Sequence, residues 1–140
     1  MAHQKKYVDV DIFLYWLCSH PEHGERARLW IRSMESTEGG GFITSALTIY
    51  EVLVFLASLK SLSLKEKTLV LQAVEAILSL PELEVVPLTK GDCRNALELM
   101  ETYHLDYEDA LHLAVALRCG ATTIVSCDSD FDDAPIGRIF

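Results

Sequence analysis

Long apolar runs are missing from this sequence: none approaches the ~20 residues that a membrane-spanning helix needs. Two lysines, Lys5 and Lys6, lie near the N-terminus, but no apolar signal core with a small-residue cleavage site accompanies them. Internal repeats, linkers and low-complexity tracts are also missing. We therefore expect one domain over residues 1–140, located in the cytoplasm and without a membrane association.

Basic residues and paired cysteines are scarce as well. The chain has 12 Lys and Arg against 21 Asp and Glu, a formal net charge of −9. Such a charge argues against a protein that coats nucleic acid, although it allows an enzyme that contacts nucleic acid briefly. The four cysteines form no CxxC pair and are irregularly spaced, which argues against a zinc site.

Short β-branched or aromatic segments alternate with pairs of amphipathic or apolar helices. This order is typical of a parallel sheet whose helices cover both faces. The sequence therefore predicts a three-layer α/β fold with a central parallel sheet of four to five strands. The expected strands cover residues 5–10, 42–44, 84–87 and 122–125, with a short edge strand in 135–140.

Residues 105–131 carry the densest set of acidic residues next to predicted structure. Asp106 and Asp109 open an almost entirely apolar helix, and Asp128 and Asp130 follow the next strand. We expect Asp106 to be the helix N-cap and Asp109 to be a metal ligand. In open α/β sheets, ligands bind at the carboxyl ends of the strands, which is where Asp128 is expected.

Two further acids belong to the first half of the chain. Asp9 ends the first strand, and Asp11 precedes an apolar helix. We expect Asp11 to be the N-cap of this helix, and Asp9 to serve in part in the same role. Glu51 is isolated in an apolar helix, where a carboxylate must be paired, protonated or bound to a cation. We favour a metal ligand over an arginine salt bridge or a protonated acid. His112 lies in the apolar helix and is expected to be a bonded core residue rather than a base.

Asp9, Glu51, Asp109 and Asp128 are therefore expected to converge at one edge of the sheet, with Asp130 as an additional ligand. Carboxylates from separate elements are the ligands that Mg²⁺ and Mn²⁺ prefer. The chain offers no convincingly spaced Ser/His/Asp or Cys/His set, so covalent catalysis has no support.

Four segments, taken together, resemble the motifs of PIN-domain nucleases. They are YVDVDIFLYWL, LTIYEVL around Glu51, EDALHLAVAL and IVSCDSDF, and they follow the family's order over nearly the whole chain. The resemblance implies a PIN-like fold and Mg²⁺- or Mn²⁺-dependent cleavage of single-stranded RNA. It implies that Asp9, Glu51, Asp109 and Asp128 are both the catalytic and the metal-binding residues.

The same resemblance implies supporting roles for Asp11 and Ser126. Val10 departs from the family, which usually has a hydroxyl residue at that position. The small size is similar to that of VapC-like toxins, which implies a homodimer and an antitoxin partner. Nearly all-apolar helical segments at residues 52–59 and 69–80 also favour a homodimer.

Two alternatives remain at this point. Asp9-Val10-Asp11 after a strand is also similar to the motif of haloacid-dehalogenase phosphatases, with Asp9 as nucleophile and Asp11 as acid and base. That interpretation leaves Glu51 and Asp109 without roles, and the chain is short for that fold. The second alternative is a PIN fold that binds a partner without catalysis.

Overall fold

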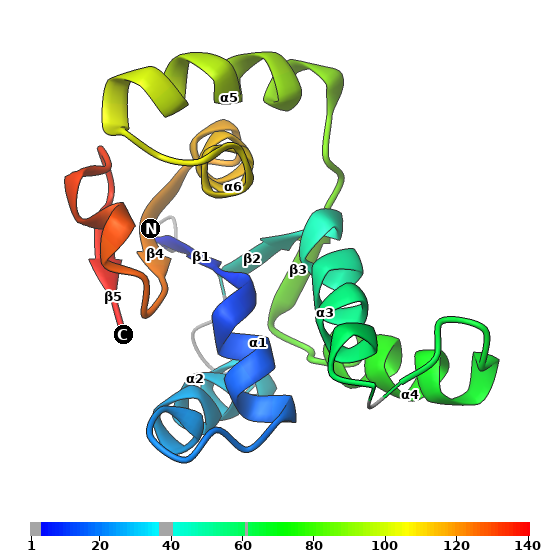
Figure 1. Cartoon of the computed structure of the whole chain (residues 1–140). Helices are drawn as coiled ribbons and strands as arrows, with labels where there is room; N and C mark the ends of the chain where they lie inside the picture. Colours follow the sequence, from blue (N-terminus) through cyan, green and yellow to red (C-terminus); the bar gives the residue numbers. More distant parts are fainter. Residues whose placement is uncertain (1–3, 37–40, 61) are drawn as a thin grey trace.

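The computed structural model describes residues 4–36, 41–60 and 62–140, and a parallel sheet of five strands forms its centre (Figure 1). The strand order is β3-β2-β1-β4-β5, and every neighbouring pair is parallel. This confirms the predicted sheet and its edge strand at the C-terminus. The strands are β1 (Lys5–Val8), β2 (Phe42–Ser45), β3 (Leu83–Val86), β4 (Ala121–Val125) and β5 (Gly137–Ile139).

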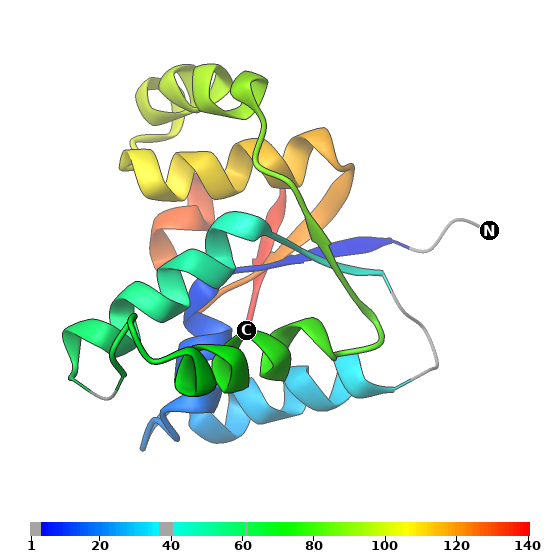
Figure 2. The same ribbon diagram turned by 90° about the vertical axis from the view of Figure 1, so that its right-hand side faces the viewer.

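Helices cover both faces of the sheet, with α5 and α6 on one side and α2 and α4 on the other (Figure 2). Within the described ranges, no helix has the length and apolar character to cross a membrane. The bounds are α1 (Val10–Leu17), α2 (Gly24–Glu35), α3 (Ala46–Ser58), α4 (Lys67–Leu78), α5 (Lys90–Tyr103) and α6 (Tyr107–Arg118), with a 3₁₀ turn η1 (Ser129–Asp133).

Alternating side chains of the strands form two hydrophobic cores. Tyr7 of β1 packs with Ile124 and the apolar side of α6, while the next residue, Val8, packs in the other core with α1 and α2. Val125 follows Ile124 in the same way. Successive strand side chains point to opposite faces, so each buried strand contributes to both layers of helices.

The first strand is shorter than predicted, and the following helix begins earlier. The residue range 5–10 was wrong at its end, because β1 stops at Val8 and α1 begins at Val10. Asp9 is extended, with φ −74° and ψ 160°, and its Oδ1 accepts a hydrogen bond from the Val10 amide at 2.8 Å. Asp9 is therefore the N-cap, and the expected N-cap Asp11 lies instead in the first turn of α1.

The order of the strands indicates at which edge of the sheet a ligand site is expected. From β1 the chain proceeds to β2 and β3 on one side, and later to β4 and β5 on the other. The point where this direction reverses lies between β1 and β4, and ligands of open α/β sheets bind outside the carboxyl ends at such a point. Val8 pairs with Val125, which brings Asp9 and Ser126 side by side at that edge.

Candidate active site

Ser126 ties the ends of β1 and β4 together. Its hydroxyl donates to Asp9 Oδ2 at 2.7 Å and lies 3.2 Å from Asp11 Oδ2. The Ser126 oxygen accepts a hydrogen bond from the Asp128 amide at 3.0 Å, and the Cys127 amide donates to Asp11 Oδ2 at 2.9 Å. Because Ser126 and Asp9 are buried, these bonds fix three aspartates relative to one another. The geometry is consistent with the supporting role expected for Ser126.

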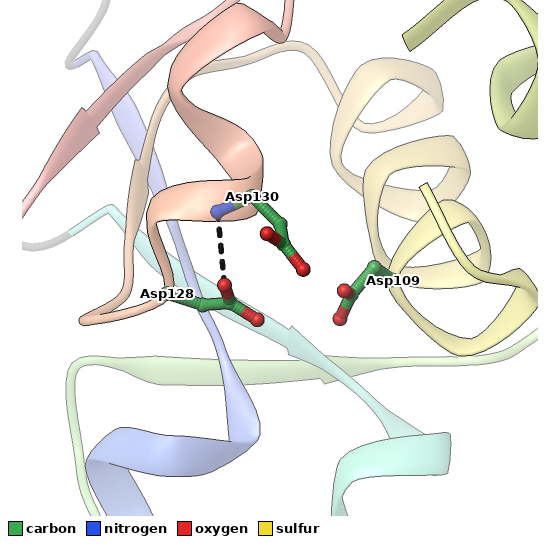
Figure 3. Close-up of side chains that lie close together, drawn as sticks. All are labelled: Asp109, Asp128 and Asp130. Carbon is green, nitrogen blue, oxygen red and sulfur yellow. Dashed lines mark hydrogen bonds between the residues drawn. The ribbon is translucent and has the colours of Figure 1, made fainter. Parts of the chain in front are cut away.

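Asp109, Asp128 and Asp130 form the outer part of the site. One carboxylate oxygen from each lies within 4.8 Å of the others, and the three side chains face a common space between α6 and η1 (Figure 3). Asp128 is the N-cap of η1 and accepts from the Asp130 amide at 2.9 Å. Asp106 accepts from the Asp109 amide at 2.8 Å, which confirms its predicted role as the N-cap of α6.

Glu51 belongs to an inner part of the site. Its Oε1 lies 2.5 Å from His112 Nε2, and His112 Nδ1 lies 2.6 Å from the Tyr7 hydroxyl. In the described part of the chain, one group of at least three candidate metal ligands has its ligand atoms within 4.8 Å of one another. Its members are Asp109, Asp128 and Asp130. Glu51 and Asp9 are therefore outside the trio, and their roles as metal ligands stay predictions.

His112 is buried and bonded, as the sequence predicted, but its link to Glu51 was not anticipated. The partner expected for Glu51, if it was not a metal ligand, was an arginine, and the structure provides a histidine instead. A signal was available, because His112 follows Asp109 by three positions and so shares its helix face. Tyr7 was missed as well, since only the packing of the sheet brings it to His112.

Negative charge is concentrated at this edge and changes the acidity of the carboxyl groups. Burial raises the pKa of Asp109 to about 7, with additional repulsion from Asp106, Asp9 and Asp128. Burial and the charge of Asp9 likewise raise the pKa of Asp11 to about 7. The pKa of Asp9 is raised chiefly by burial, against the opposing effects of His112 and the Ser126 hydrogen bond.

The pKa of His112 reflects the same crowding. Burial alone lowers it, but the hydrogen bond to Glu51 and the negative charges of Asp9 and Asp109 outweigh this effect, so the pKa of His112 is raised. The carboxylates around His112 therefore favour its protonated, positively charged form.

The residues at this edge fit a divalent cation. Two carboxylate oxygens, Asp11 Oδ1 and Glu51 Oε2, are buried and have no hydrogen-bond partner among the described residues. An unpaired buried oxygen is costly unless a further ligand or a proton satisfies it. The atoms available as metal ligands are carboxylate oxygens, which is the ligand type of Mg²⁺ and Mn²⁺ rather than of zinc.

An apolar groove adjoins the acids. It has a volume of about 760 Å³ and lies between α1, α3 and the start of α6. Glu51, Asp106 and Glu108 belong to its lining, and the remaining lining residues are largely apolar and include Leu14 and Val54. Glu51 thus belongs both to the lining of the groove and to the hydrogen bond with His112.

Comparison with known proteins identifies the family and agrees with the fold. The model of the PIN domain family matches residues 6–137. Ribonuclease VapC13 of Mycobacterium tuberculosis is 30% identical over 132 residues, which are 91% of this chain and 93% of the relative.

Solved structures show the same fold at lower identity. VapC20 of Mycobacterium tuberculosis, a toxin that cleaves the sarcin-ricin loop, matches with a TM-score of 0.71 and 19% identity, covering 94% of this chain and 96% of that one. A chain in a toxin-antitoxin complex from Klebsiella pneumoniae matches with a TM-score of 0.67 and 18% identity, covering 97% of each. The family model and the VapC relative span nearly the whole chain, and the fold agrees with both; the chain belongs to the PIN domain family.

Proposed function

We propose that this chain is the ribonuclease toxin of a toxin-antitoxin pair and cleaves single-stranded RNA with Mg²⁺ or Mn²⁺. The observation that carries the proposal is the convergence of Asp109, Asp128 and Asp130 at the point between β1 and β4 where the strand order reverses. The family and the VapC relative add to it, because that relative is a ribonuclease.

The chain's own residues supply binding and orientation. Asp109, Asp128 and Asp130 would hold the cation, with Asp9 and Glu51 as the remaining proposed catalytic and metal-binding residues. When bound, a divalent cation lowers the pKa of a coordinated water and neutralises charge on the scissile phosphate. Ser126 keeps the Asp9 carboxylate in place.

His112 does not take part as a general base in this proposal. Its side chain is buried, and both ring nitrogens are already engaged, by Tyr7 and by Glu51. A base must reach the proton that it removes, directly or through one water. In this proposal the carboxylates, and not His112, orient the attacking water.

The phosphatase alternative finds little support in the geometry of Asp9. A phosphatase nucleophile needs an accessible carboxylate oxygen, but Asp9 is only 3% exposed. Its two oxygens accept hydrogen bonds from the Val10 amide and the Ser126 hydroxyl. The family model that matches residues 6–137 is also that of the PIN domain, in agreement with the nuclease interpretation.

We also propose two protein partners: a second copy of the chain and an antitoxin. The homodimer is supported by large exposed apolar side chains on α3, at its C-cap and on α4, which are Phe55, Leu59, Leu71 and Leu78. The antitoxin is supported by the similarity to a chain of a toxin-antitoxin complex. An antitoxin segment seated in the apolar groove would cover Glu51 and so restrict access to the acids.

The proposed activity is tested with purified protein, labelled single-stranded RNA and Mn²⁺, Mg²⁺ or EDTA. We expect the parent protein to cleave the RNA with Mn²⁺ or Mg²⁺ and not with EDTA. The Asp9→Asn variant should not cleave it with either cation. A parallel reaction contains a phosphate monoester instead of RNA. Hydrolysis of the monoester without RNA cleavage would support the phosphatase. Absence of both cleavage and cation binding would support a PIN-fold binding module, because a module that has lost catalysis need not keep the cation.

A further inference from the structure

Three secondary-structure elements meet in one buried hydrogen-bond chain beside the acids. Tyr7 comes from β1, His112 from α6 and Glu51 from α3. The Tyr7 hydroxyl lies 2.6 Å from His112 Nδ1, and His112 Nε2 lies 2.5 Å from Glu51 Oε1. Tyr7 and His112 are fully buried, whereas the side chain of Glu51 is 11% exposed.

The direction of the second bond follows from the chemistry of the two groups. An ionised carboxylate can only accept a hydrogen bond, so Nε2 of His112 carries the hydrogen that is donated to Glu51. The imidazole is held in turn by Tyr7, which belongs to the central strand of the sheet. The position of Glu51 Oε1 is therefore set by the His112 ring, which is itself held by Tyr7 of β1.

The other oxygen of Glu51 is in a different situation. Oε2 is buried and has no hydrogen-bond partner in the described ranges. The two oxygens of one carboxylate are therefore divided: Oε1 is engaged by His112, and Oε2 is the one left to bind a further group.

We propose that His112, held by Tyr7, is a positioning residue that makes Glu51 a one-oxygen metal ligand and so favours small divalent cations over Ca²⁺. This inference rests on the proposed function, because it requires Glu51 to be a ligand. A hydrogen bond from a neighbouring side chain commonly sets the orientation of a ligating carboxylate. Here the bond also determines how many oxygens are available.

The number of available oxygens matters because the cations differ in what they require. Ca²⁺ accepts six to eight oxygens at about 2.3–2.6 Å and often binds both oxygens of a carboxylate. Mg²⁺ needs near-octahedral geometry at about 2.0–2.1 Å, which single oxygens from several side chains provide. Release of Oε1 from His112 would allow Glu51 to bind through both oxygens, and Ca²⁺ would gain relative to the smaller cations.

The test measures dissociation constants for Mn²⁺ and Ca²⁺ by calorimetry at fixed pH, without RNA. The variants are His112→Leu, which removes the donor, and His112→Gln, whose amide can still donate to Glu51. Tyr7→Phe keeps the ring that packs in the core but removes the group that holds His112. Asp92→Asn serves as a matched control, because it weakens a partly buried ion pair with Arg118 at the opposite end of α6.

We expect His112→Leu to weaken Mn²⁺ binding by roughly 10- to 100-fold, the usual effect of removing a group that orients a ligand. Ca²⁺ binding should weaken less, so the preference for Mn²⁺ falls. Changes in charge or stability that weaken both cations alike cancel in the ratio of the two constants. His112→Gln should restore most of the preference, Tyr7→Phe should lower it in the same direction, and Asp92→Asn should leave it unchanged.

The possible failures are distinguishable. If the parent protein binds neither Mn²⁺ nor Ca²⁺, the metal-dependent function and this inference both fail. If the parent binds Mn²⁺ but His112→Leu weakens both cations equally, the inference alone fails. Melting curves show whether each variant is folded; if His112→Leu is not, an unchanged preference in folded Tyr7→Phe overturns the inference.

Discussion

Asp109→Asn should make the metal-free protein more stable at alkaline pH. The raised pKa of Asp109, about 7 against an ordinary 3.8, means that the folded state keeps this proton to a higher pH than the unfolded state. The resulting contribution to stability is fully present below pH ~4 and is lost as the pH rises through about 7. Asparagine has no such proton, so the variant avoids the loss.

The size of the effect follows from the shift. At about 1.36 kcal/mol per pKa unit, a rise from 3.8 to about 7 corresponds to roughly 4 kcal/mol. Asp109 is only partly buried, so we halve this value for solvent screening, to about 2 kcal/mol. For a chain of this length, that difference raises the melting temperature by about 5–10 °C.

The assay is thermal melting of parent and variant in EDTA between pH 4 and 8. We expect equal melting temperatures near pH 4 and a growing advantage for the variant toward pH 8. Addition of Mn²⁺ at ~100 times its Kd should stabilise the parent by about 2.7 kcal/mol and the variant much less. A variant that is no more stable than the parent at pH 8 would refute the electrostatic argument, and an undiminished response to Mn²⁺ would place the cation elsewhere.

Three further predictions follow from the site and the surface. Ser126→Ala should destabilise the fold by about 1–3 kcal/mol, because it removes the hydroxyl that is hydrogen-bonded to both Asp9 and Asp128. It should also slow RNA cleavage; denaturant unfolding measures the first effect and the cleavage rate the second. Asp106→Ser should preserve both activity and stability, whereas Asp106→Ala should cost about 1 kcal/mol in stability, because serine also caps helices well; an inactive but folded serine variant would show that Asp106 does more than cap. Light scattering at micromolar concentration should give twice the 15.7 kDa of one chain, and a monomer mass would contradict the proposed dimer.

Much of the fold could be predicted from local patterns. Alternation of short strands with helices indicated a parallel sheet with helices on both faces, and the five strands confirm it. Asp106 was recognisable as a helix cap, because a short side-chain oxygen before a helical segment satisfies a free backbone amide. These features depend on residues close together in the sequence, which is why the pattern was sufficient.

The details of the site depend on packing between distant segments. Glu51 and His112 are 61 positions apart, and only the placement of α3 against α6 brings them together. Asp130 was expected merely as an additional ligand, but the 3₁₀ turn η1 carries it to Asp109 and Asp128. The first strand was predicted too long because two nearby aspartates, Asp9 and Asp11, were both plausible caps, and backbone geometry decides between them.

The most direct test of the central claim is a comparison of RNA cleavage by four single variants in Mn²⁺. Asp109→Asn, Asp128→Asn and Asp130→Asn each remove one carboxylate of the converging trio. Asp133→Asn is the matched control, since Asp133 is an exposed aspartate on the same turn as Asp130 but outside the trio. We predict that the three trio variants remain folded and cleave single-stranded RNA no faster than the parent in EDTA, while Asp133→Asn cleaves at the parent's rate. Trio variants that retain the parent's rate would contradict the proposed active site.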